Sequence, residues 1–151
     1  MSVQNEKSSP GISLQSMLEA IQEAANMESI KQILFKQILG VFQVEMASIF
    51  LVKKNNEELA SWLLIPGDSV KQIVVPIKTN SIVGYVASKI ESVNLRDAYN
   101  VQELRRVGSE LNFSDSYDVT ANVHSKQILA VPIVKDDTTI GVLQLINKRD
   151  D

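Results

Sequence analysis

Two pairs of short apolar segments, each pair joined by a polar turn, constrain the fold of this chain most strongly. The first pair, Met46–Val52 and Leu59–Ile65, flanks the turn sequence KKNNEE. The second pair, Gln127–Lys135 and Thr139–Asn147, flanks the sequence DDT. Short segments rich in β-branched residues and bounded by turn residues are typical of β-hairpins. We therefore expect a sheet that begins and ends with antiparallel hairpins.

A third strand is expected between these hairpins. The turn sequence Pro66-Gly67-Asp68 precedes an apolar segment, Val70–Ile77, that carries Pro76 near its end. A second proline, Pro132, lies inside an expected strand. Because proline cannot donate a ladder hydrogen bond, Pro132 indicates an edge strand, a bulge, or a strand that begins later. The sequence leaves these three alternatives open.

Helical periodicity precedes the first hairpin in two segments. In the first, Ser13 is a candidate N-cap and apolar residues recur on one face from Leu14 to Ala25. In the second, Ser29 and Gln32 match a capping box ahead of another apolar stripe. Gly40 is expected to weaken the last turn of that helix.

Two shorter helices are expected after the third strand. Ser81 is a candidate N-cap for a helix whose apolar stripe runs to Ile90. Gly84 lies inside this helix, where glycine costs about 1 kcal/mol relative to alanine, so we expect close packing against another backbone. Asn100 and Glu103 match a second capping box. That helix should end near Gly108, and the polar sequence NFSDSYDVTANVHS that follows is expected to form a long loop.

This order of elements predicts an α+β domain in which a mostly antiparallel sheet of five to six strands is flanked by helices. The 151 residues suit one domain with an ordinary core. Residues 1–11 are polar and are expected to form a flexible tail, which leaves residues 12–151 for the folded domain.

Composition excludes several classes of function. The chain has no cysteine, which rules out disulfides, thiolate nucleophiles and thiolate metal sites. Its net charge of -3 provides no basic field for phosphates, so we expect no nucleic acid partner. The N-terminus lacks the apolar run of a signal peptide, and no segment approaches the roughly 18 apolar residues of a membrane span. We expect a cytoplasmic protein that does not contact membranes.

The sequence IVGYVASKIESVNLRDAYN resembles the segment of GAF domains usually written Ile-x-Gly-x-Val-Ala, a turn, then Val-Asn-Ile-x-Asp-Ala-Tyr. The sequence QILAVPIVKDDTTIGVLQLINK is similar to the closing GAF hairpin, and the likeness covers roughly residues 14–148. This resemblance implies a GAF/PAS-like fold and a sensory or regulatory module rather than an enzyme. It also implies an effector domain in the same native chain and a further C-terminal helix, both beyond this sequence.

The expected ligand site combines a helix start with the polar loop. The helix N-terminus after Thr79 presents unpaired N–H groups that suit a phosphate or carboxylate, and the loop would supply hydrogen bonds and a lid. In the alternative interpretation, of equal weight, Ser81 is only an N-cap and the loop only a solvated connection. The candidate ligand-binding residues are Asn80, Ser81, Ile82, Asp97, Tyr99, Tyr117, Asp118, Thr120, His124 and Ser125.

The ligand itself is left unknown, with a cyclic nucleotide as one candidate. Cyclic-nucleotide-binding GAF domains resemble one another in an acidic pair followed by Ser-Thr-Gly-Phe-x-Thr. This chain matches that signature at Asp118 and Ser125. It has Tyr117 in place of an acidic residue and Ala121 in place of a hydroxyl-bearing residue. His124 is the only histidine, and a loop role is favoured over axial ligation of haem. Covalent bilin attachment requires cysteine and is excluded. No catalytic or metal-binding residues are expected.

The stripe from Leu14 to Ala25 has two interpretations, since it could cover the sheet or form half of a dimer seam; we favour the dimer. The leading hypothesis is a non-catalytic GAF domain that binds a small molecule and signals to a downstream effector through a homodimer formed by this N-terminal helix. The alternative is a ligand-free GAF domain that acts only in dimerisation or protein interaction.

Overall fold

The computed structural model describes residues 27–65, 72–115 and 123–149. The chain divides into two compact units, Met1–Gln43 and Val44–Asp151, and each is described by itself. The tail at residues 1–11 and the helix expected from Leu14 to Ala25 lie outside the described residues.

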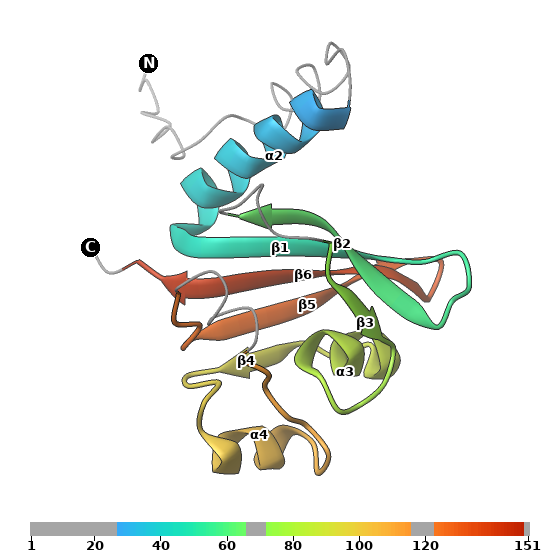
Figure 1. Ribbon diagram of the computed structural model, residues 1–151, viewed down its shortest axis with the longest axis vertical. Helices are drawn as coiled ribbons and strands as arrows, with labels where there is room; N and C mark the ends of the chain where they lie inside the picture. The colour runs from blue at the N-terminus through green and yellow to red at the C-terminus, as the bar shows by residue number, and fades with distance from the viewer. Residues whose placement is uncertain (1–26, 66–71, 116–122, 150–151) are drawn as a thin grey trace, which may run out of the picture. The chain divides into compact units, whose positions relative to one another are not determined.

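Helix α2 (Met27–Phe42) is the described element of the first unit (Figure 1). The expected N-cap at Ser29 is wrong, because Ser29 lies inside the helix, two residues after Met27. Gly40 lies in the last turn of the helix, as expected. The helix ends after Phe42, where Gln43 takes a left-handed φ of 50° and donates its backbone N–H to the Leu39 carbonyl at 3.1 Å.

The second unit is built on a six-stranded sheet in the order β3-β2-β1-β6-β5-β4 (Figure 1). All five neighbouring pairs are antiparallel, and the first and last strands lie side by side in the middle of the sheet. This confirms the α+β class and the mostly antiparallel sheet of five to six strands. The strands are β1 (Val44–Val52), β2 (Glu58–Ile65), β3 (Val74–Pro76), β4 (Val93–Leu95), β5 (Ile128–Lys135) and β6 (Thr138–Lys148).

Both expected hairpins are present, and each closes with residues suited to a tight turn. The β1–β2 turn places Asn56 at a φ of 58°. The β5–β6 turn consists of Asp136 and Asp137, with φ values of 51° and 60° between the paired residues Lys135 and Thr138. Two successive left-handed residues match the right-handed twist of the flanking strands, which is the geometry of a two-residue type I′ hairpin turn.

The short strand β4 was not predicted from the sequence. Its three residues pair with Ile128–Ala130 of β5 and form one edge of the sheet. Beyond Ala130, the described pairings give β5 a neighbour on one side only, and the register shifts between Ile133 and Val134. Pro132 therefore lies where β5 has become a local edge beside a bulge, which resolves the alternatives left open by the sequence.

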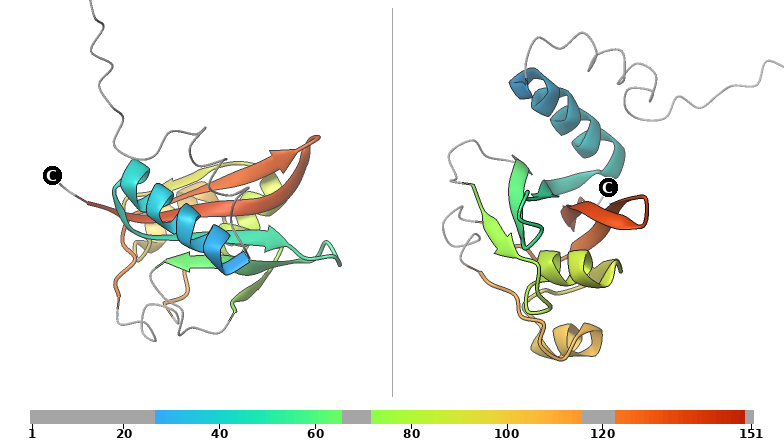
Figure 2. Two further views of the ribbon diagram at one scale, coloured as in Figure 1. Left: turned by 90° about the horizontal axis from the view of Figure 1, so that it is seen from above. Right: turned by 90° about the vertical axis from the view of Figure 1, so that its right-hand side faces the viewer.

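Helix α3 (Ile82–Lys89) packs against β3, β5 and β6, and helix α4 (Val101–Val107) contacts β4 (Figure 2). We call the side of the sheet that α3 covers the inner face. Side chains from this face and from α3 form the core, together with Leu104 of α4 and Leu111 beyond it. The buried members on the strands are Met46, Phe50, Leu59, Val93, Leu95, Ile128, Ala130, Val142 and Ile146.

Candidate functional site

The start of α3 carries three of the residues expected to bind a ligand. Ser81 is the N-cap, as expected, and its Oγ accepts a hydrogen bond from the Gly84 N–H at 3.1 Å. Ile82 is a core residue that is only 5% exposed. Asn80 is exposed, and its carbonyl accepts a hydrogen bond from the Asn112 N–H at 3.0 Å. The structure thus gives Ser81 a capping role and Ile82 a packing role, and it leaves their contact with a ligand a prediction.

Gly84 allows the turn before α3 to lie close to the backbone of the helix. A Cβ at Gly84 would lie 2.5 Å from the carbonyl oxygens of Pro76 and Lys78 and 2.7 Å from Ser81 Oγ. The turn that follows β3 therefore lies directly against the first turn of α3, which confirms the expected close packing against backbone. A side chain of any size at this position would push that turn away from the helix.

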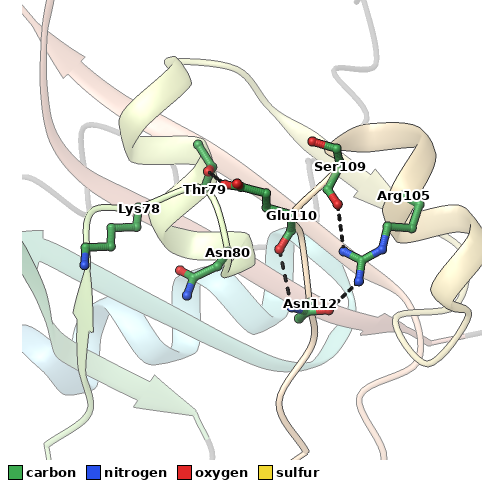
Figure 3. Close-up of a pocket in the computed structure, with 7 residues that line it drawn as sticks. All are labelled: Lys78, Thr79, Asn80, Arg105, Ser109, Glu110 and Asn112. Carbon is green, nitrogen blue, oxygen red and sulfur yellow. Dashed lines mark hydrogen bonds between the residues drawn. The ribbon is translucent and has the colours of Figure 1, made fainter.

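A polar depression of about 480 Å³ lies beside this turn (Figure 3). Most of its polar groups bond to one another rather than pointing toward a common centre. Thr79 Oγ1 donates to Glu110 at 2.9 Å, and Arg105 donates to the carbonyls of Ser109 and Leu111 and to Asn112 Oδ1. These bonds join the turn before α3 to the segment after α4, which is a structural role. The lining residues are Lys78, Thr79, Asn80, Arg105, Ser109, Glu110 and Asn112.

A closed set of hydrogen bonds fixes the turn that carries Asp97 and Tyr99. Asp97 Oδ1 accepts from the Tyr99 N–H at 3.0 Å, and Asn100 Oδ1 accepts from the Glu103 N–H at 3.1 Å. The expected capping box is thus half correct, because the Glu103 carboxylate does not return to Asn100. It accepts instead from the backbone N–H groups of Arg96 at 2.5 Å and Asp97 at 3.2 Å, and so ties the turn to α4.

Three rings meet where this turn approaches the segment before β5. The Tyr99 ring stacks on His124 with centroids 4.5 Å apart and planes inclined by 9°. Phe113 meets the same tyrosine edge-on at 5.0 Å. The structure therefore brings together Tyr99 and His124, two of the predicted site residues, and adds Phe113, which sequence reasoning missed. A lone phenylalanine in a polar segment gave no signal of this contact.

The segment before β5 contains the last predicted residues. Ser125 is 2% exposed, so it is buried although it lies in an irregular segment. His124 is exposed, and its carbonyl accepts a hydrogen bond from Asn147 Nδ2. Tyr117, Asp118 and Thr120 lie outside the described residues, so their part in a site stays a prediction.

A pair of buried polar side chains on the inner face was also missed. Ser48 of β1 and Gln144 of β6 are directly opposite each other in the ladder, between the core residues of their strands. They are 5% and 9% exposed, and neither side chain forms a hydrogen bond in the part of the chain that the structure describes. Among the described residues, every side-chain nitrogen or oxygen atom that is fully shielded from solvent has a hydrogen-bond partner. The polar ends of Ser48 and Gln144 therefore border space that solvent can enter.

The electrostatic character of the interior is neutral. The buried polar residues of the described chain are Ser48, Ser61, Ser125 and Gln144, none of which carries a charge. Ser61 differs from Ser48 because its Oγ accepts a hydrogen bond from the Ile73 N–H at 2.8 Å. Among the described residues, no three His, Asp or Glu side chains gather as a metal site would require. The polar groups of Ser48 and Gln144 on the inner face are thus an uncharged hydroxyl and an uncharged amide.

The GAF domain family model matches residues 26–151. The chain belongs to the GAF domain family. It is similar to the dual 3′,5′-cyclic-AMP and -GMP phosphodiesterase 11A of Takifugu rubripes, with 29% identity over 145 residues. That match covers 87% of this chain but only 15% of the phosphodiesterase, so the chain corresponds to a small part of its relative.

Solved structures confirm the GAF fold. The GAF domain of a phosphoenolpyruvate-protein phosphotransferase from Coxiella burnetii superposes with a TM-score of 0.66 at 15% identity, over 88% of this chain and 74% of that one. The free methionine-R-sulfoxide reductase from Neisseria meningitidis superposes with a TM-score of 0.60 at 15% identity, over 90% and 74% of the two chains. GAF domains are generally regulatory, but this neighbour shows that the fold also occurs in enzymes. No helix within the described residues has the length and apolarity to span a bilayer.

Proposed function

We propose that this GAF domain is a non-catalytic sensory module that binds a small molecule against the inner face of its sheet. The observation that carries the proposal is the Ser48–Gln144 pair. Polar side chains are uncommon among the core residues of a sheet, and the polar ends of this pair border space that solvent can enter. A ligand that bonds to both groups takes the place of solvent there.

The neutral character of these groups favours a ligand with a planar, uncharged hydrogen-bonding edge. A serine hydroxyl and a glutamine amide can each donate and accept, which suits a nucleobase. The similarity to a cyclic nucleotide phosphodiesterase supports a cyclic nucleotide as the first candidate. In this proposal Ser81 and Asp118 contact the ligand as well, and Tyr99, His124 and Ser125 belong to its walls.

The test is a thermal-shift titration with cyclic AMP and cyclic GMP, supported by native mass spectrometry. A ligand present at a hundredfold excess over its dissociation constant should add about 2.7 kcal/mol to the free energy of unfolding. The double variant Ser48→Val/Gln144→Leu should keep the fold and lose this gain, because the two apolar side chains fill similar space without hydrogen-bonding groups. Ser81→Ala and Asp118→Ala should each weaken the binding.

Ser61→Val is the matched control. It also removes a buried hydroxyl, but it leaves the Ile73 N–H without its acceptor, so it should lower stability by roughly 1–3 kcal/mol and keep the ligand response. A double variant at Ser48 and Gln144 that responds to the nucleotide like the native protein would refute the proposed site. No response of the native protein to either nucleotide would remove cyclic nucleotides as ligands.

We further propose that the module acts in the cytoplasm, as a homodimer through the helix predicted from Leu14 to Ala25, on an effector domain of the same native chain. The small share of the phosphodiesterase that this chain covers supports such a multidomain arrangement. Sedimentation should show a dimer that becomes a monomer when residues 1–25 are removed. A dimer that retains no small molecule in a broad thermal-shift screen would favour the alternative, a domain for dimerisation or protein interaction only.

A further inference from the structure

Ser109 lies in the turn directly after α4, close to two arginines. Arg105 and Arg106 are the only adjacent arginines of the chain, and they precede Ser109 by four and three residues. No other serine or threonine of the chain has an arginine three residues before it. An arginine at this distance from a hydroxyl is the charge pattern by which basophilic serine/threonine kinases select their substrates. Ser109 therefore has the local sequence of a phosphate acceptor.

The fold leaves the hydroxyl of Ser109 accessible. Ser109 is exposed, and its Oγ makes no hydrogen bond within the described residues. Access for a kinase also requires the last turn of α4 to open, because Arg106 and Ser109 must reach the kinase together. That turn ends at Val107 in a helix of seven residues, and Gly108 after it already has an extended φ of -154°. The end of so short a helix opens at little cost in free energy.

A cation already lies beside the place that a phosphate on Ser109 would occupy. Arg105 donates to the Ser109 carbonyl at 3.1 Å, so its guanidinium is within reach of a phosphate on the Oγ of the same residue (Figure 3). Lys78 lines the same depression and forms no ion pair among the residues that the structure describes. Arginine can bind a phosphate with two parallel N–H groups, which makes Arg105 the expected partner.

Arg105 at present supports a link between the segment after α4 and the start of α3. Its guanidinium donates to the Leu111 carbonyl at 2.8 Å and to Asn112 Oδ1 at 3.1 Å. The Asn112 N–H in turn donates to the Asn80 carbonyl at 3.0 Å, directly before the cap at Ser81. A hydrogen bond between two charged groups is about twice as strong as one between neutral groups, so a phosphate would draw Arg105 away from Leu111 and Asn112.

We propose that Ser109 is a phosphorylation site for a basophilic serine/threonine kinase, and that its phosphate detaches the segment after α4 from the turn before α3. In the kinase, the Ser109 Oγ attacks the γ-phosphorus of ATP. The bond between Oγ and phosphorus forms, the bond from that phosphorus to the oxygen of the β-phosphate breaks, ADP leaves, and the hydroxyl proton passes to the catalytic base of the kinase.

Two further effects of the phosphate act in the same direction as the loss of Arg105. The phosphate repels Glu110, whose carboxylate accepts a hydrogen bond from Thr79 Oγ1 at 2.9 Å. A negative charge just after the C-terminus of α4 also opposes the dipole of that helix. The link at Thr79 and the link at Asn80 therefore weaken together.

The first experiment measures phosphate transfer with magnesium ATP and a kinase that selects an arginine three residues before its target. It should place a phosphate on the native protein, and peptide mass spectrometry should locate it on Ser109. Ser109→Ala should abolish the transfer. Arg106→Ala should slow it by about tenfold or more, because the kinase loses a charged contact. This variant removes none of the hydrogen bonds that Arg105 donates.

Ser114 is the matched control within the native protein. It is also an exposed serine of this segment, but Leu111 stands three residues before it, so it should remain unmodified. A synthetic peptide of residues 102–115 shows whether the kinase accepts the local sequence. Phosphorylation of the peptide alone would overturn the proposal, because the fold would then withhold Ser109. Failure with both peptide and protein would also overturn it, and so would modification of Ser114 as fast as Ser109.

The second experiment follows the response of the segment by hydrogen exchange and NMR. In the phosphorylated protein the Asn112 amide should exchange about tenfold faster, because its hydrogen bond to Asn80 opens, while the paired amides of β1 and β6 stay protected. Arg105→Ala keeps Arg106 and should still be phosphorylated. This variant should show faster exchange at Asn112 before phosphorylation and little further change after it. An Asn112 amide that is equally protected with and without phosphate would overturn the proposal, and so would equal acceleration throughout the sheet.

Discussion

The replacement Gly84→Ala provides the sharpest test of how α3 is seated on the sheet. In the structure the added Cβ would lie 2.5 Å from two carbonyl oxygens, those of Pro76 and Lys78, and these are backbone atoms that cannot rotate away. The turn after β3 and the first turn of α3 must therefore separate by several tenths of an ångström. The same movement weakens the cap in which Ser81 Oγ accepts from the Gly84 N–H.

The magnitude follows from three contributions. Overpacking of this kind costs about 1–3 kcal/mol, and loss of an N-cap costs about 0.5–2 kcal/mol. Alanine recovers about 1 kcal/mol through its higher helix propensity. The net loss should therefore be about 2 kcal/mol. With an unfolding entropy of about 2.1 cal/mol/K per residue over a unit of roughly 110 residues, this loss lowers the melting temperature by about 9 °C.

Circular dichroism with thermal and urea unfolding measures this change, and Gly40→Ala is its matched control. Gly40 also lies inside a helix, but a Cβ there would meet nothing within 4 Å. Its replacement should therefore leave stability unchanged or raise it by about 1 kcal/mol at most. A Gly84→Ala protein as stable as the native one would refute the close approach of the two backbones. Equal losses in both variants would show that helix flexibility, rather than space, explains both glycines.

Three further predictions concern local features of the second unit. Ile90 ends α3 in the left-handed region with a φ of 55°, although it is β-branched, and its side chain is 47% exposed. Ile90→Gly should therefore raise the free energy of unfolding by about 1 kcal/mol in a urea titration. A loss of stability would contradict this account. The Tyr85 hydroxyl donates a hydrogen bond to the Val107 carbonyl at 3.1 Å. Tyr85→Phe should therefore destabilise the protein by about 1 kcal/mol. An unchanged urea midpoint would show that water replaces this bond. Hydrogen bonds from Lys53 and Asn55, with the charge of Lys53, hold the pKa of Glu58 below its ordinary value of 4.5. The β1–β2 hairpin should therefore be more stable above that pH and lose this contribution as the pH falls through the lowered pKa; amide exchange in the hairpin should show this loss in the native protein and not in Glu58→Gln.

Local sequence signals predicted the elements that depend on few neighbouring residues. The cap at Ser81, the two hairpin turns and the close packing at Gly84 follow from rules that act over a few residues, and the structure confirms each of them. The errors made from local signals concern where a helix begins. Ser29 is a good capping residue, yet it lies inside α2, because a favourable residue type alone does not determine where a helix starts.

Contacts between distant parts of the chain were decided only by the tertiary structure. The pairing of β1 with β6 places Ser48 beside Gln144, which are almost a hundred residues apart, and no local pattern marks either residue. The same holds for β4, whose three residues form a strand only because β5 offers a free edge. Asn147 looked like the end of a strand in the sequence, but the folded chain brings His124 and Glu45 to its amide. The physical reason is that such groups gain their partners only after the sheet has formed. The sequence alone therefore determined the elements that depend on local signals, and the order of the strands determined which side chains meet.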